Sequence, residues 1–218
     1  FLAKKGYEVH FISSELHARL DMTDPNIFFP KVNVQTYPLF KHQPFDIALS
    51  STIYQVVKLH KLDILHAHYA IPYAYAAFFA KQMLKEENSD IPLVTTLHGT
   101  DITLVGQHPS YKHAVEFSIN QSDKITTVSE SLKADTLKFF QISKEIEVIT
   151  NFIDNKEFED LRVCQRNQFA NDDEKILIHV SNLRPVKRVQ DVLDIFKKVE
   201  KSVKSKLLIL GDGPDVEL

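Results

Sequence analysis

The sequence predicts an α/β fold built on parallel β-sheets, and three observations lead to this class. Short apolar or β-branched runs alternate with stretches of helical period along the 218 residues, which is typical of repeated strand–helix–strand units. Hydrophobic residues make up 44% of the chain, enough for one large domain or two smaller ones with real cores. No apolar run reaches the roughly 18 residues of a membrane-spanning helix, so a globular protein is expected.

Six strands are expected in the first part of the chain, each of them a short run rich in apolar or β-branched residues. They cover residues 8–13, 33–38, 63–69, 93–98, 124–129 and 147–151. Helical period is found over residues 45–61, 74–87 and 129–140. Gly6 has the position of a helix C-cap before the first strand, and Ser129 has that of an N-cap.

The character of the sequence changes after Asn151. Residues 154–174 are polar and have no sustained period, as expected of a connection between domains. Strands over 175–182 and 206–213 then flank a helix over 187–202. The apolar residues of that helix have helical spacing and should pack on the sheet: Val189, Val192, Leu193, Phe196, Val199 and Val203.

The expected architecture is therefore two Rossmann-like domains that face each other across a cleft. Residues 1–153 would form most of the N-terminal domain, without its first strand, and 154–218 a linker and the start of the C-terminal domain.

Composition argues against several classes of function. The net charge of −3 and the pI near 6.4 give no case for nucleic-acid binding. A single cysteine, Cys164, excludes an internal disulfide, fits a reducing compartment and has no evident partner for nucleophilic catalysis. The first residues lack the apolar core of a signal peptide. A cytoplasmic protein without stable membrane association is expected, and the lysines 197, 198, 201 and 204 are interpreted as a solvated helix face.

A polar cluster, "LHGTD", follows the strand expected over 93–98. In parallel sheets, ligands bind where loops and helix N-termini meet beyond the carboxyl ends of the strands. Thr96 and Thr100 offer hydroxyl groups, and Thr100 or Asp101 would cap the helical turn that follows. This exit could hold a small carboxylate or phosphate. The alternative is that Thr100 and Asp101 are helix caps and nothing more.

The preceding strand ends in "HAHYAIP". His66 and His68 should point to the same face of the strand, which could indicate a metal pair. No third ligand stands at a suitable spacing, so we expect no metal and interpret the histidines as hydrogen-bonded to backbone carbonyls. Tyr69, at the strand tip, is the better candidate ligand-binding residue, with an amphipathic core tyrosine as the alternative.

A second cluster, "SNLRPVKR", lies between a strand and a helix in the second part of the chain. Asn182, Arg184, Lys187 and Arg188 would surround a helix N-terminus, where cations oppose the helix dipole unless a polyanion is bound. A diphosphate is the expected ligand, and surface charges that contact only solvent are the alternative. In the "GDGP" that follows, Gly211 and Gly213 would let the backbone approach a ligand closely, although this is a weak signal.

These motifs together resemble the retaining glycosyltransferases of family 4, which have the GT-B fold. The residues that carry the resemblance are "HAHYAIP", "TTLHGTDIT", "QSDKITTVSESL", "NFID", "SNLRPVKRVQDV" and "LLILGDGP", in the expected order across nearly the whole chain. The combination of "HYAIP", "LHGTDIT" and "RPVKRVQDV" is specific. It resembles members that transfer N-acetylglucosamine from UDP-N-acetylglucosamine to L-malate, the first step of bacillithiol biosynthesis.

The resemblance implies roles for individual residues. His98 would lie beside the sugar at the reacting centre, and the acceptor would contact Tyr69, Thr96, Thr100 and Asp101. The nucleotide and its diphosphate would contact Asn182, Arg184, Lys187, Gly211 and Gly213, with the two cations neutralising the leaving group. Neither a metal nor a cofactor would be needed. The family pattern Gly-Arg-x-x-Pro-x-Lys has Asn182 at its arginine position here, so Lys187 transfers directly and Arg184 only by proximity.

Both ends are expected to lie inside a longer protein. The glycine-rich loop of the family would precede Phe1, and the paired glutamates that hold the donor would follow Leu218, so the 218 residues alone should show no turnover. Three alternatives stay open: a family-4 enzyme with another acceptor such as a lipid-linked sugar or inositol phosphate, a UDP-N-acetylglucosamine 2-epimerase on the same fold, and a non-catalytic sugar-nucleotide sensor. Assembly into a homo-oligomer is also compatible with the sequence.

Overall fold

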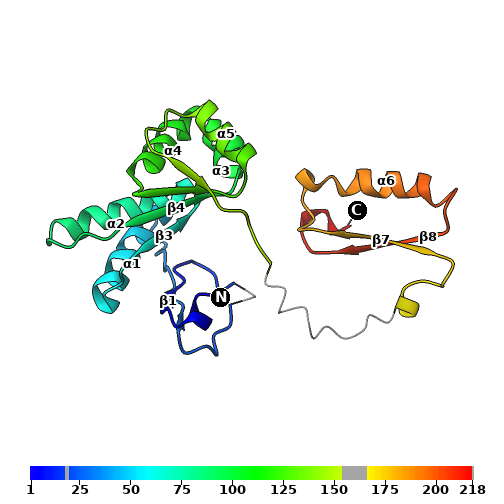
Figure 1. Ribbon diagram of the computed structural model, residues 1–218, viewed down its shortest axis with the longest axis horizontal. Helices are drawn as coiled ribbons and strands as arrows, with labels where there is room; N and C mark the ends of the chain where they lie inside the picture. The colour runs from blue at the N-terminus through cyan, green and yellow to red at the C-terminus, as the bar shows by residue number, and fades with distance from the viewer. Residues whose placement is uncertain (18–19, 154–165, 218) are drawn as a thin grey trace. The chain divides into compact units, whose positions relative to one another are not determined.

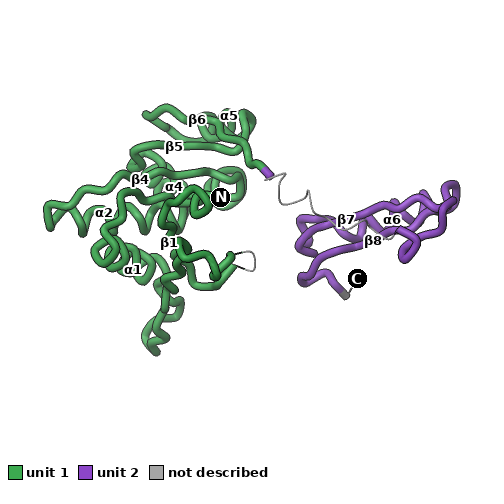
Figure 2. The backbone as a smooth tube through the Cα atoms, turned by 60° about the horizontal axis from the view of Figure 1, so that its bottom comes forward, with its two compact units in different colours: residues 1–152 green, residues 153–218 purple. Residues whose placement is uncertain are grey.

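The computed structural model describes residues 1–17, 20–153 and 166–217. Contacts divide the chain into two compact units, Phe1–Phe152 and Ile153–Leu218 (Figure 2), and each is described by itself. Cys164 and most of the connection expected over 154–174 lie outside the described residues.

A four-stranded parallel sheet forms the centre of the first unit. Its strands run in the order β3 (Leu65–His68), β4 (Leu93–Leu97), β5 (Lys124–Thr127) and β6 (Ile146–Val148). β3 alternates, because Leu65 and Ala67 are buried whereas His66 and His68 are exposed. β4 is apolar at both ends and almost wholly buried, as expected for a strand between two others. The parallel α/β class predicted from the sequence is confirmed.

Helices cover the sheet in two groups (Figure 1), and each group packs on an apolar cluster of its own. α1 (Phe45–His60) and α2 (Tyr75–Lys85) pack on each other and on β3 and β4. α3 (Thr100–Thr103), α4 (Pro109–Gln121) and α5 (Glu130–Phe139) cover the other cluster, which includes residues of β5 and β6. Ser129 caps α5 as predicted, because its hydroxyl oxygen accepts a hydrogen bond from the Leu132 N–H at 3.1 Å.

The N-terminal segment forms a much smaller sheet than expected. Gly6 ends a 3₁₀ turn over Ala3–Lys5 in the left-handed conformation, with φ of 87°, as its C-cap position predicted. β1 (Val9–His10) then pairs in parallel with β2 (Ile27–Phe28). The strand predicted over 33–38 is wrong. The apolar alternation there reflects packing without a ladder, since Val32 and Val34 contact the cluster under α1 and α2 from irregular backbone.

The second unit contains one strand–helix–strand set. β7 (Lys175–Val180) and β8 (Ser205–Leu210) pair in parallel over six residues, and α6 (Val189–Val199) connects them. The predicted apolar stripe is buried or half-buried from Val189 to Val199, but Val203 lies beyond the helix and is 43% exposed. None of the helices in the described ranges has the length and apolar content needed to cross a bilayer.

An ion pair joins α2 to the amino ends of β4 and β5. Lys81 is 5% exposed, and its Nζ lies 2.6 Å from Asp123 Oδ2, which also accepts the Leu93 N–H at 2.7 Å. Partial burial raises the pKa of Asp123, but the bonds from Lys81 and Leu93 outweigh it, so the pKa is lowered overall. The carboxylate therefore holds the buried ammonium group and the start of a central strand together.

We predict that Asp123→Asn lowers the free energy of unfolding by about 2 kcal/mol, because it removes the nearer counter-charge of the buried Lys81 and leaves only the more distant Asp90, at 3.4 Å, beside the ammonium group. The control is Glu147→Gln, which removes the exposed partner of Lys124 at 3.5 Å and should cost under about 1 kcal/mol. Urea unfolding of both variants measures the difference. Equal costs would contradict the importance of the buried pair.

Candidate functional site

The exit of β3 turns sharply at Tyr69. This residue has φ of 76° and ψ of 142°, an uncommon conformation for a residue with a side chain. Its N–H donates to the Thr96 carbonyl at 2.9 Å, and its own carbonyl accepts from the Ala74 N–H at 3.2 Å. These bonds fix Tyr69 against β4 and leave its side chain 36% exposed at the strand tip.

The buried carboxylate of Asp101 holds the exits of β3 and β4 together. Asp101 is 3% exposed. Its Oδ2 accepts the Ala70 N–H at 2.9 Å, and its Oδ1 accepts the Gly99 N–H at 3.1 Å and the His98 N–H at 3.4 Å. The prediction that Thr100 or Asp101 caps the following helix is wrong. Gly99, with φ of 121°, has the N-cap position, and Asp101 reaches back from inside α3.

A small pocket opens beside these two exits. It has a volume of about 190 Å³ and is lined by Tyr69, Ile71, Thr100, Asp101 and Val105. Pockets for drug-sized ligands have volumes of about 300–1,000 Å³, so this one suits a smaller molecule. Its lining combines the apolar Ile71 and Val105 with residues that carry polar groups, and such groups can orient a small polar ligand.

Three histidines form a row next to the Tyr69 ring. His66 stacks on His68 with ring centroids 4.5 Å apart, and His68 Nδ1 lies 2.8 Å from His98 Nε2. The His98 ring is in turn 4.9 Å from that of Tyr69. In the described part of the chain nothing bonds to His98 Nδ1, so this nitrogen is available to a ligand.

Two members of the row, His66 and His68, are held in the neutral form. Loss of hydration, followed by the effects of the neighbouring His66 and His98, lowers the pKa of His68 to about 4. Loss of hydration, followed by the effect of His98, also lowers the pKa of His66. Because His68 stays uncharged near neutral pH, its contact with His98 is a hydrogen bond in which one of the two rings donates.

Thr96 lies behind the row and outside the pocket wall. It is 8% exposed, and its hydroxyl group lies 2.8 Å from His66 Nε2 and 2.7 Å from the Thr126 hydroxyl oxygen. The expectation that His66 and His68 bond to backbone carbonyls is wrong, because their partners are side chains. Sequence reasoning also missed the contact of His68 with His98. The pairing of His68 with Thr96 in the sheet carries this information, since His98 follows Thr96 by two residues.

In the second unit, Asn182, Arg184 and Lys187 all have exposed side chains on the loop after β7. The Lys187 N–H donates to the Arg184 carbonyl at 2.8 Å and closes a 3₁₀ turn over Pro185–Lys187. Arg188 forms an ion pair with Asp191 in the first turn of α6. Arg184 and Lys187 have no ion-pair partner among the described residues and are free to meet an anion.

Gly211 and Gly213 lie against backbone of the same unit. A Cβ on Gly211 would be 1.8 Å from the Ser181 carbonyl oxygen, and one on Gly213 would be 2.3 Å from that of Leu183. The φ angles of 152° and 153° also disfavour a side chain. The two loops are joined directly, since the Leu183 N–H donates to the Asp212 carbonyl at 2.9 Å. Both glycines therefore let the loop after β8 support the loop that carries Arg184 and Lys187.

The first unit thus gathers Tyr69, His98, Thr100 and Asp101 at one pair of strand exits, and the second gathers its five predicted residues at another. Residues 1–157 match the family model described as Glycosyltransferase Family 4, which is more than half of the chain. The chain belongs to glycosyltransferase family 4.

A curated relative narrows the comparison within the family. The chain is 46% identical over 216 residues to the N-acetyl-alpha-D-glucosaminyl L-malate synthase of Bacillus anthracis. The match covers 98% of this chain and 56% of the relative. This family-4 chain therefore spans about half the length of the curated relatives it matches.

Solved structures share the fold at low sequence identity. A sucrose-phosphate synthase from Thermosynechococcus elongatus aligns with a TM-score of 0.72 and 12% identity, over 100% of this chain and 55% of that one. A candidate UDP-N-acetylglucosamine 2-epimerase from Listeria monocytogenes aligns with a TM-score of 0.53 and 14% identity, over 87% and 49%. These likenesses support the GT-B fold predicted for the family-4 chain.

We predict that Asp101→Asn lowers the free energy of unfolding of this glycosyltransferase chain by about 2 kcal/mol, because an amide cannot accept all the hydrogen bonds that the carboxylate accepts. Asp63→Asn, at an exposed position before β3, is the control and should change it by less than about 0.5 kcal/mol. Urea titrations of both variants supply the comparison. An Asp101→Asn protein as stable as the control would show that the backbone hydrogen bonds accepted by Asp101 contribute little to the stability of the fold.

The neutral histidines also predict a pH dependence of stability. The ordinary pKa of 6.5 applies to His68 in the unfolded chain, and the folded value is about 4. Between these values the unfolded chain binds more protons, so the free energy of unfolding should fall as the pH falls from about 6.5 towards 4. His68→Gln should make this fall shallower, whereas His113→Gln, on an exposed part of α4, should leave it unchanged. Urea unfolding at about pH 7.5 and pH 5 tests this, and parallel slopes in all three proteins would refute it.

Proposed function

We propose that the intact protein transfers N-acetylglucosamine from UDP-N-acetylglucosamine to the hydroxyl group of L-malate, with retention at the anomeric carbon. The observation that carries this proposal is the 46% identity, over 98% of the chain, to a relative named as the N-acetyl-alpha-D-glucosaminyl L-malate synthase. The chain contains both polar clusters from which a small acid and a nucleotide diphosphate were predicted.

The acceptor would bind in the pocket beside the β3 and β4 exits. Its volume of about 190 Å³ suits a small diacid, and the Tyr69 and Thr100 hydroxyl groups can donate hydrogen bonds to carboxylates. Asp101 is buried and already accepts three hydrogen bonds from backbone N–H groups. We therefore propose that it fixes the shape of the pocket and does not bind the acceptor directly. Thr96 would have an indirect role, because its hydroxyl group forms a hydrogen bond with His66 and holds that ring in place.

His98 would contact the sugar at the reacting centre. Its Nε2 bonds with His68, and its Nδ1 is left for a substrate hydroxyl group. Because a hydroxyl group can donate or accept, this contact works with either arrangement of the proton between the two rings. The neutral His66 and His68 orient the His98 ring without bringing a positive charge next to it.

The second unit would hold the donor. Arg184 and Lys187 would neutralise the charge that develops on the diphosphate as the glycosidic bond breaks. Asn182 lies on the same loop, and Gly211 and Gly213 support it. In the proposed front-face displacement, the malate hydroxyl oxygen bonds to the anomeric carbon while its proton goes to the departing phosphate oxygen of UDP. This route needs no pair of catalytic carboxylates.

Other acceptors and another reaction are less well supported. A phosphorylated acceptor would favour added cations, but the described lining of the pocket contains neither lysine nor arginine. The likeness to a candidate 2-epimerase concerns the fold alone, at 14% identity. Action without a metal or cofactor, a cytoplasmic location and the oligomeric state remain predictions from the sequence.

Product analysis of the intact protein tests the proposal. With UDP-N-acetylglucosamine and malate, we expect UDP and N-acetylglucosaminyl malate in equal amounts. Inositol phosphate in place of malate should give no glycoside. Conversion of UDP-N-acetylglucosamine to a UDP-mannosamine product without any acceptor would contradict the transferase assignment and favour an epimerase.

We predict that His98→Ala lowers kcat by about 100-fold or more, as expected for the loss of a hydrogen bond at the reacting centre. His98 is half-buried at a strand exit, so the melting temperature of the His98→Ala protein should stay close to that of the parent protein. His113→Ala is the matched control and should keep full activity. A folded His98→Ala protein with unchanged kcat would remove this residue from the reacting centre.

A further inference from the structure

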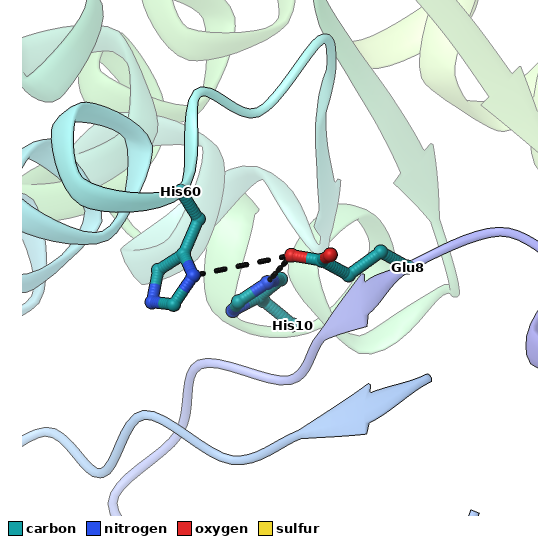
Figure 3. A group of neighbouring side chains, drawn as sticks. All are labelled: Glu8, His10 and His60. Carbon is teal, nitrogen blue, oxygen red and sulfur yellow. Dashed lines mark hydrogen bonds and ion pairs between the residues drawn. The ribbon is translucent and has the colours of Figure 1, made fainter. Parts of the chain in front are cut away.

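A second group of histidines lies where the N-terminal segment meets the end of α1. Glu8 precedes β1, His10 ends it, and His60 is the last residue of α1 (Figure 3). Each of the three can offer one ligand atom, and these atoms all lie within 4.8 Å of one another. In Figure 3 the Glu8 carboxylate points toward both imidazole rings.

We propose that Glu8, His10 and His60 form a binding site for a divalent transition metal of the zinc class. Two imidazole nitrogens and one carboxylate are a ligand set that suits zinc and its neighbours, whereas magnesium and calcium prefer oxygen ligands alone. A water molecule would complete a tetrahedral shell.

The distances require only a small movement to accommodate the ion. His10 Nε2 lies 2.6 Å from Glu8 Oε1, and His60 Nδ1 lies 3.9 Å from the same oxygen. Ligand atoms around a tetrahedral zinc ion are about 3.3 Å apart, for bonds of about 2.0–2.1 Å. The ion would replace the hydrogen bond between His10 and Glu8, so Glu8 would move slightly away from His10 and closer to His60.

The three side chains differ in burial, and therefore in how far each can move to bind the ion. The His10 side chain is 1% exposed and stacks on the Phe28 ring with centroids 4.7 Å apart, so its position is fixed. The side chains of Glu8 and His60 are 51% and 33% exposed and can adjust. Their exposure also gives the ion a path from solvent and leaves room for the water ligand.

The surrounding charge favours a cation. The carboxylate of Glu8 is negative, and the C-terminus of a 16-residue helix carries a partial negative charge at His60. One feature limits the affinity. His10 Nδ1 is buried and has no hydrogen-bond partner within the described ranges, and such partners typically strengthen metal binding by about 10–100-fold. We therefore expect micromolar rather than nanomolar affinity for zinc.

The ion would link the small N-terminal sheet to the end of α1, because its ligands come from both. β1 and β2 share only two residue pairs, so a metal that also holds His60 would add a link between distant parts of the chain. The cluster is separate from the pocket, because His60 precedes β3 and Tyr69 follows it. The proposal therefore concerns stability and is independent of the proposed transfer reaction.

Zinc titration of the intact protein, first stripped with a chelator, tests the site. We expect one zinc ion per chain by calorimetry, no binding of magnesium, and a higher melting temperature with zinc present. Glu8→Gln and His60→Gln should each weaken zinc binding at least tenfold and abolish the rise in melting temperature. His113→Gln, at an exposed position of α4, should bind zinc like the parent protein.

Two results would overturn the proposal. One is zinc binding that persists in Glu8→Gln and His60→Gln but disappears in His68→Gln, which would place the ion on the strand-exit histidines. The other is no binding by the parent protein at micromolar zinc. Both tested residues are partly exposed, and melting temperatures without zinc that match the parent protein would establish that the variants fold.

Discussion

The candidate site of the first unit depends on one buried carboxylate. Asp101 accepts backbone N–H groups from the exits of two adjacent strands, Ala70 after β3 and Gly99 after β4. A charged acceptor in a buried position makes strong hydrogen bonds, and the N–H groups in turn stabilise its charge. Because Tyr69 and His98 directly precede these anchored residues, one carboxylate fixes the separation of the two side chains that would face the acceptor and the sugar. The pocket between the exits is therefore a rigid feature of the strand ends.

The central sheet could be predicted from the sequence, because β3 to β6 are short runs rich in apolar or β-branched residues separated by stretches of helical period. Asp101 could be placed at the site but not given its role, since a capping residue and a carboxylate that reaches back across two strands look the same in a sequence. The contact between His68 and His98 depends on the register of β3 against β4, and the group of Glu8, His10 and His60 depends on the position of α1. The strand expected over 33–38 failed for a related reason. Val32 and Val34 alternate because they pack against helices, and alternation alone does not distinguish this from a ladder.

The glycines of the second unit illustrate the same limit in a different form. A glycine in a loop indicates that something lies close to the backbone, but not what. The prediction placed a ligand there, whereas the nearest atoms to a Cβ on Gly211 or Gly213 are carbonyl groups of the loop that carries Arg184 and Lys187. In the proposed reaction, this contact would give the two glycines an indirect role in donor binding. The two loops after β7 and β8 brace one another, and the exposed cations are presented by a supported turn instead of a free strand end.

The charges of the two units differ, and this difference suggests a separate role for each unit in the proposed reaction. His66 and His68 at the first site are neutral near physiological pH, since loss of hydration lowers the pKa of both. The described pocket wall also contains no cation, so this site offers an acceptor hydrogen bonds and shape but little positive charge. A neutral site avoids trapping the leaving diphosphate, whose stabilisation needs positive charge in the transition state. That charge would come from Arg184 and Lys187, which have no ion-pair partner among the residues described. On this argument the first unit would select the acceptor, and the second would supply the electrostatic stabilisation for bond breaking in the proposed reaction.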